Sequence, residues 1–130
     1  MKFIFAFIFS LFACSSFSQS HHLFVYYTFK GIEDGYDHLN KIKVYVDDKL
    51  VKESDEKIES KANGLHVRIP SGLHTIKVEN WAYYQDKWEL HSKTNGYSLD
   101  LISTKTKYID ADYVWRLLYD LDGDVQESFK

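Results

Sequence analysis

Short runs in which apolar and polar residues alternate constrain the fold of this chain more than any other feature. The runs at residues 65–69 ("LHVRI") and 74–78 ("HTIKV") are examples. Runs of this kind, rich in β-branched and aromatic residues, recur between polar turn clusters along the chain. Alternation with a period of two places one set of side chains on the inner face of a half-buried strand. Many short strands separated by turns are typical of an all-β fold, and we expect an antiparallel β-sandwich.

The break between these two runs, residues 70–73, predicts a hairpin turn. If both apolar faces point to the same side of one sheet, Ile69 lies opposite His74. Pro70 then supplies the fixed φ of a four-residue connection built on a type I turn. A ligand-binding nest at residues 71–72 is the alternative. The same register places His66 and His74 on opposite faces, so we expect that they do not share a metal ion.

Other segments have weaker patterns. Residues 23–29 are apolar on both faces and predict a strand buried on both sides, whereas the polar residues 53–64 predict a loop with a candidate short helix. Asn95–Gly96 predicts a turn between strands at 86–91 and 97–102. Residues 105–120 fit both a helix and a strand, and their aromatic side chains favour a strand.

The N-terminus predicts export. A positive start is followed by an apolar run at residues 3–13, and small residues then precede Gln19. This pattern is typical of a signal peptide over residues 1–18 with cleavage before Gln19, which leaves residues 19–130 as a single β-sandwich domain. We therefore expect a secreted, periplasmic or cell-surface protein.

Cys14 offers an alternative to free export. Residues 11–14 ("LFAC") resemble a bacterial lipobox, in which the cysteine carries lipid. Lipidation would anchor the domain to the envelope, and only in that case do we expect a membrane contact. Because Cys14 is the chain's one cysteine, no disulfide is expected in the mature domain.

The remaining composition disfavours several functional classes. With 16 basic and 19 acidic residues the formal charge is −3, which argues against nucleic acid as a partner. Zinc-type spacing of histidines and cysteines is absent. Residues 120–124 ("DLDGD") resemble the start of a calcium loop. The glycine at the sixth position and the glutamate at the twelfth position of such a loop are missing. Candidate paired carboxylates, Glu79 and Glu89, are predicted to face solvent. We expect no enzyme, cofactor or metal site.

The aromatic segment at residues 80–88 is the best candidate contact surface. Trp81, Tyr83, Tyr84 and Trp88 would supply the rings, which can stack on sugars or anchor a protein partner. The alternative is that the segment folds over the end of the sandwich and closes its core.

Two stretches carry a family resemblance. Residues 44–51 ("VYVDDKLV") and 69–79 ("IPSGLHTIKVE") resemble the PEGA-type and related carboxypeptidase-regulatory-like modules of bacterial envelope proteins. Asp48 replaces the glycine that such modules favour. The segment between the two stretches is also longer than is usual in these modules. The resemblance implies an Ig-like or transthyretin-like sandwich without catalytic residues, often exported and lipid-anchored.

Together these features predict an exported, non-catalytic interaction or structural module of the bacterial cell envelope, with a protein or glycan of the envelope as its partner. One alternative is a carbohydrate-binding module that uses the exposed aromatic residues. The second is a small metal-dependent or hydrolytic enzyme.

Overall fold

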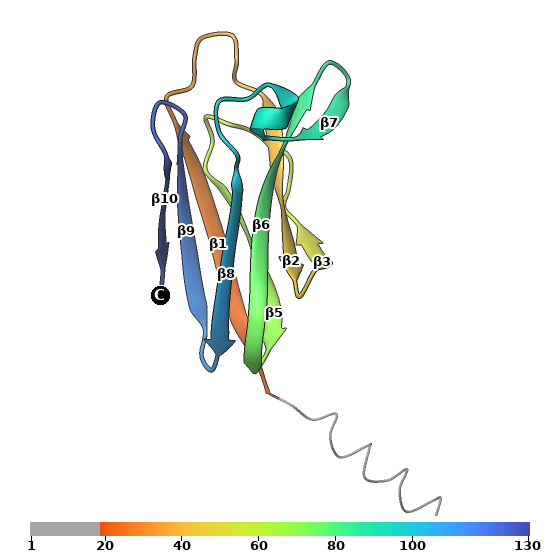
Figure 1. The fold of residues 1–130 in the computed structure, drawn as a ribbon, viewed down its shortest axis with the longest axis vertical. Helices are drawn as coiled ribbons and strands as arrows, with labels where there is room; N and C mark the ends of the chain where they lie inside the picture. Colours follow the sequence, from red (N-terminus) through yellow and green to blue (C-terminus); the bar gives the residue numbers. More distant parts are fainter. Residues whose placement is uncertain (1–18) are drawn as a thin grey trace, which may run out of the picture.

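The computed structural model describes residues 19–130 (Figure 1). The expected signal peptide and Cys14 lie outside these residues. The described chain forms ten strands and one 3-10 turn: β1 (Ser20–Lys30), β2 (Leu39–Val46), β3 (Lys49–Glu53), β4 (Lys57–Ile58), β5 (Asn63–Pro70), β6 (Gly72–Tyr84), β7 (Lys87–Leu90), η1 (Lys93–Asn95), β8 (Ile102–Ile109), β9 (Tyr113–Asp120) and β10 (Val125–Phe129). No helix in this part of the chain is long and apolar enough to cross a membrane.

The strands form two sheets, an arrangement consistent with the expected β-sandwich. Sheet A has the order β10-β9-β1-β5, and sheet B has the order β3-β2-β6-β7, with β4 pairing with β2 and β8 pairing with β6. All ladders are antiparallel except that of β1 with β9, which is parallel. The expectation of a purely antiparallel sandwich is therefore wrong at this one ladder.

Alternating side chains from both sheets build a single apolar core. The inward residues of β5 are Leu65, Val67 and Ile69, and those of β6 begin with Ile76 and Val78; all five are buried, as the sequence predicts. The largest fully buried side chain is that of Trp115 on β9. Figure 1 shows the long axis of the sandwich, with short turns at the lower end and longer connections at the upper end.

The connection at residues 70–73 joins the two sheets, so the predicted hairpin is wrong. β5 pairs with β1 in sheet A, whereas β6 pairs with β2 and β8 in sheet B. Ser71 anchors the corner by donating a backbone hydrogen bond to Gln19 (2.8 Å). Both strands still face the same core because the inner faces of two packed sheets point toward each other. The side chains predicted to face the core, such as Ile69 and Ile76, do face it. The predicted pairing of Ile69 with His74 is wrong.

Three further expectations are changed. β1 is buried on its inner face only, because sheet A has no layer outside it, and Tyr26 on the outer face is 41% exposed. Residues 97–102 form a loop that reaches β8 only at Ile102, and residues 53–64 contain the short strand β4 and no helix. Residues 105–120 belong mainly to β8 and β9. The prediction of strand rather than helix for this segment is therefore confirmed.

Candidate functional site

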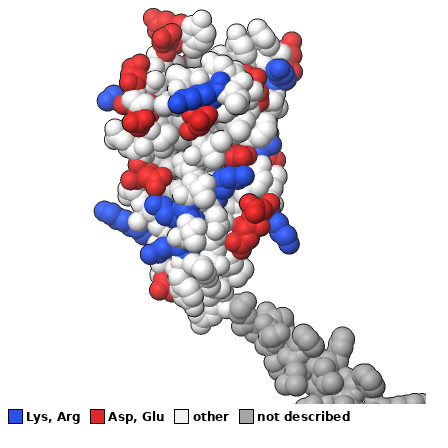
Figure 2. Space-filling view, in the orientation of Figure 1, with Lys and Arg blue, Asp and Glu red and all other residues white. Residues whose placement is uncertain are grey.

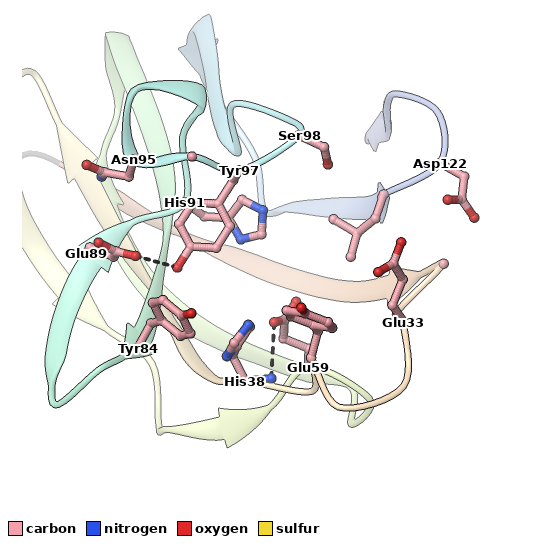
Figure 3. A pocket seen from close by; sticks show the side chains of 14 residues that line it. Glu33, His38, Glu59, Tyr84, Glu89, His91, Asn95, Tyr97, Ser98 and Asp122 are labelled. Carbon is pink, nitrogen blue, oxygen red and sulfur yellow. Dashed lines mark hydrogen bonds between the residues drawn. The ribbon is translucent and has the colours of Figure 1, made fainter.

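A cavity of about 380 Å³ opens at the end of the sandwich where the long connections lie (Figures 1 and 3). Its lining comes from the β1–β2 loop, the segment after β4, the β6–β7 hairpin, the η1 loop and the β9–β10 turn. The lining residues are Gly31, Glu33, Tyr36, His38, Glu59, Tyr84, Glu89, His91, Asn95, Gly96, Tyr97, Ser98, Leu121 and Asp122. The volume lies within the range of pockets that hold small molecules.

Glu59 is held at the cavity wall by a connection between two loops. Its backbone N–H donates to the carbonyl of His38 (2.9 Å), and the N–H of His38 donates to Glu59 Oε1 (3.3 Å). Next to it, Asp37 accepts hydrogen bonds from the backbone and hydroxyl of Ser60. Glu59 is only 2% exposed, and its Oε2 has no hydrogen-bond partner among the described residues. Burial raises the pKa of Glu59 to about 7, against the smaller opposing effect of the His38 N–H.

His91 lies on another wall of the cavity, fixed by its backbone. Its N–H donates to the carbonyl of Asn80, and its carbonyl accepts from Leu101, both at 2.9 Å. The imidazole packs on the ring of Tyr97 with centroids 4.1 Å apart. It is 2% exposed, and neither ring nitrogen has a partner within residues 19–130. Burial, with a smaller effect of His38, lowers the pKa of His91 to about 4, so the ring is neutral near pH 7.

Aromatic rings and carboxylates line the remaining walls. Figure 3 shows Tyr97 in front of His91, with the Tyr97 hydroxyl donating to Glu89 Oε1 (2.7 Å). Burial and this hydrogen bond raise the pKa of Tyr97, so its phenol stays protonated. Tyr84 lies edge-to-face with His38, with ring centroids 5.2 Å apart.

A buried hydrogen-bond network adjoins this site and links the two sheets. Tyr27 of sheet A donates to Asn40 Oδ1 (2.7 Å), and Asn80 Nδ2 donates to the same oxygen (2.9 Å). Asn63 Nδ2 in turn donates to the Tyr27 hydroxyl (3.0 Å). Because the Asn80 carbonyl also accepts from the backbone N–H of His91, the network adjoins the segment after β7 that carries His91. Buried polar groups that hydrogen-bond to one another favour one arrangement of the sheets, and Asn80 Oδ1 alone in this network has no partner among the described residues.

The four predicted aromatic residues divide between two surfaces. Trp81, Tyr83 and Trp88 lie on the outer face of sheet B, where Tyr83 pairs directly with Trp88 across the β6–β7 ladder. Tyr84 has the opposite parity and lines the cavity. Glu89 pairs with the buried residue Ala82 and faces the cavity, so the predicted outward orientation of Glu89 is wrong.

The outer-face aromatic residues do not form a flat platform. The rings of Tyr83 and Trp88 are inclined at 58° with centroids 5.3 Å apart. The ammonium of Lys41 lies 4.4 Å from the centroid of Trp88, and that of Lys43 lies 3.9 Å from the centroid of Trp81. These cation–π contacts occupy ring faces that a sugar would stack on. The geometry therefore gives no support to sugar stacking at this patch.

The histidines and acidic residues considered as metal ligands are dispersed. His66 lies 2.5 Å from a ring nitrogen of His22 on the outer face of sheet A, whereas His74 binds Asp47 in sheet B at 2.6 Å. Asp120 ends β9, and residues 121–124 form the β9–β10 turn. Within the described chain, no group of three or more His, Cys, Asp or Glu side chains is arranged to hold a metal ion.

Sequence reasoning missed Glu59 and His91. These residues line the same cavity only because segments that are distant in sequence pack side by side. Glu59 lies in a polar stretch that resembles a solvated loop. The available signal was in the strands: Asn40 and Asn80 occupy inward positions in otherwise apolar alternation. A polar residue at the inward position of two strands marks a buried polar region, because such groups require hydrogen-bond partners.

Comparisons with known proteins identify no family. No family model matches the chain, and no curated protein matches it. Among solved structures, a chain described as "Crystal Structure of Gram Negative Toxin" is similar with a TM-score of 0.43 and 6% identity, over 87% of this chain and 23% of that chain. A likeness at this level carries no inference about function.

Proposed function

We propose that this chain is an exported, non-catalytic interaction module of the cell envelope, Ig-like or transthyretin-like in type, that binds its ligand in the cavity at the loop end. The observation that carries the proposal is that Glu59 and His91 line the same cavity. Both side chains are 2% exposed, and both have polar atoms without a partner among residues 19–130.

Unpartnered buried polar atoms favour a ligand here. Leaving a buried donor or acceptor unpaired costs about 1–3 kcal/mol. Three such atoms, Glu59 Oε2 and the two ring nitrogens of His91, belong to residues that line the same cavity. A bound polar molecule would satisfy them together, which is the usual role of the few polar groups in a ligand pocket.

Binding, rather than catalysis, agrees with the contacts of these groups. In the described residues neither Glu59 nor His91 hydrogen-bonds to a Ser, Thr or Lys side chain, so no base–nucleophile pair is assembled at the cavity. The Tyr97 phenol is kept protonated by burial and by Glu89. These features support a recognition site of fixed geometry.

Blocking the cavity tests the proposal. The ¹⁵N-labelled protein would be titrated with a panel of alkylamines, neutral monosaccharides and small carboxylic acids, and the backbone amides of His38, Glu59 and His91 followed by NMR. At least one class is expected to shift these amides, and Ser98→Trp, at the cavity wall, is expected to abolish the shifts. Thr104→Trp, on the outer face of β8, is the control. If no class shifts these amides, the proposal is wrong.

A hydrolytic enzyme is the second candidate, favoured by one observation. A carboxyl group whose pKa is about 7, as at Glu59, matches the requirement for a general acid near neutral pH. Turnover of p-nitrophenyl glycosides or esters that is lost in Glu59→Gln, with ligand shifts retained, would establish this candidate in place of the first.

A further inference from the structure

The charge of the cavity lining is the first guide to its ligand. The lining residues include four carboxylates, Glu33, Glu59, Glu89 and Asp122, and none of them is a lysine or arginine. Figure 3 shows Glu33 and Asp122 on one side of the cavity and Glu89 on the other. Elsewhere acidic and basic side chains are interspersed over the visible surface (Figure 2). A concave site lined by one sign of charge concentrates ligands of the opposite sign.

The aromatic lining agrees with a cation. Tyr36, Tyr84 and Tyr97 all line the cavity, and Leu121 adds an aliphatic side chain. The face of an aromatic ring attracts a cation through its quadrupole, and the same ring packs well against an alkyl chain. An anion would meet repulsion from both the carboxylates and the ring faces.

The unpartnered atoms narrow the class further. Glu59 offers one free carboxylate oxygen, since its other oxygen already accepts from the His38 N–H. A neutral His91 offers one acceptor nitrogen. A primary ammonium has three N–H donors, enough in number for both acceptors, whereas a quaternary ammonium has none. We infer that the loop-end cavity recognises a primary ammonium group on an alkyl chain, through Glu59, His91 and the tyrosine rings.

This inference rests on the proposed function and specifies its ligand. The ammonium has two possible sources, a free alkylamine or the lysine side chain of a partner polypeptide. Both present the same group on a similar aliphatic chain. Separate probes, n-butylammonium for the first source and Nα-acetyl-lysine-N-methylamide for the second, distinguish them.

Chemical-shift titration of the full protein with matched probes provides the test. Both ammonium probes are expected to shift the amides of His38, His91 and Tyr97. We expect n-butanol, of similar size without charge, and tetramethylammonium, charged without donors, to bind at least about tenfold more weakly. Tighter binding of the lysine probe than of n-butylammonium would assign a polypeptide source, and the reverse order a free amine.

The variant Glu59→Gln tests the contact itself. It is expected to weaken n-butylammonium binding by about tenfold or more at pH 8, whereas Glu56→Gln, an exposed site outside the cavity with the same charge change, leaves binding unaltered. An amide spectrum of Glu59→Gln that matches wild type away from the cavity shows that the variant is folded.

The pH dependence gives an independent readout. If only ionised Glu59 binds the ammonium, wild-type affinity rises about tenfold from pH 6 to pH 8. The other titratable groups around Glu59 and His91 are Asp37, His38, Tyr27, Glu33, Glu89 and Asp122, together with the three tyrosines that line the cavity. Their contribution remains in Glu59→Gln, so the difference between the two proteins isolates Glu59.

Different failures have different meanings. If glucose or n-butanol shifts the cavity amides as strongly as n-butylammonium, the ammonium assignment is wrong while the proposed binding function stands. If the affinity is the same in wild type and Glu59→Gln, the assigned contact is wrong. If no probe of any class shifts these amides, the proposed function fails with it.

Discussion

Glu59 is expected to make the free energy of unfolding fall as pH rises. Its pKa is about 7 in the folded protein against an ordinary value of 4.5, because burial disfavours the carboxylate. Between these two pH values the unfolded chain has released the proton and the folded chain has kept it. At about 1.4 kcal/mol per pH unit, the folded state loses about 3 kcal/mol, and the loss is complete above pH 7.

His91 is expected to have the opposite effect. Its pKa falls from 6.5 to about 4 in the folded protein, because burial and the nearby His38 disfavour the imidazolium. Between these values the unfolded chain binds a proton that the folded chain does not. The free energy of unfolding therefore rises with pH by about 3 kcal/mol, and this stability is fully present above pH 6.5. From pH 4.5 to 6.5 the two residues should nearly cancel in wild type.

Urea denaturation from pH 4 to 8, followed by tryptophan fluorescence, measures the contributions of Glu59 and His91 to the free energy of unfolding separately when each residue is substituted. The difference in free energy between Glu59→Gln and wild type should rise by about 3 kcal/mol from pH 4.5 to above 7. For His91→Phe, which keeps an aromatic ring against Tyr97, the difference should fall by a similar amount from pH 4 to 6.5. Differences remove the background of surface carboxylates, and Glu56→Gln serves as the exposed control. Differences that stay constant with pH would refute the burial argument for both residues.

Three further predictions use the same urea assay at pH 7. In Gly64→Ala, a Cβ would lie 2.6 Å from the Val25 carbonyl in the paired strand β1, so we expect a loss of at least about 2 kcal/mol; unchanged stability would mean that the strands are not this close. Asn40→Ala removes the acceptor of the Tyr27 hydroxyl within the buried network and should cost about 2–4 kcal/mol, and a cost below about 1 kcal/mol would contradict the network. Asp48→Gly should stabilise by about 1 kcal/mol, because Asp48 has a left-handed φ of 67° in the β2–β3 turn; destabilisation would show that the aspartate side chain is needed there.

Alternation predicted which side chains face the core but not which sheet holds them. Val67 and Ile76 are both inward in the structure, as the pattern requires, yet they belong to different sheets. The inner faces of two packed sheets point toward each other, so a corner between sheets and a hairpin within one sheet have the same parity. Only the pairing partners, which lie far away in sequence, distinguish the two. For β5 the partner is β1, and the partners of β6 that are distant in sequence are β2 and β8.

The site was less predictable than the fold because its residues meet through loops. Glu59 reaches the cavity because residues 37–38 hydrogen-bond to residues 59–60. No local sequence pattern predicts this contact. The polar character of Glu89 predicts an outward orientation, whereas the residue faces the cavity, because a polar side chain at an inward position can line a polar site as well as solvent. Tyr97 lies in a segment predicted as a strand, whereas it belongs to a loop that leaves its hydroxyl free to bind Glu89.

The buried network lies at the end of the molecule where Glu59 and His91 line the cavity with unpartnered polar atoms. In the middle of the sandwich, apolar side chains such as Ile42 and Val78 fill the space between the sheets. Toward the loop end the inward positions change to Asn40 and Asn80. Asn40 accepts from the Tyr27 hydroxyl, which joins the two sheets, and Asn80 donates to the same oxygen of Asn40. A hydrogen-bonded layer of this kind joins the two sheets at this end of the apolar core. Beyond this layer the long loops enclose the cavity. Glu59 and His91 line it, and their side chains have polar atoms without a hydrogen-bond partner among the described residues.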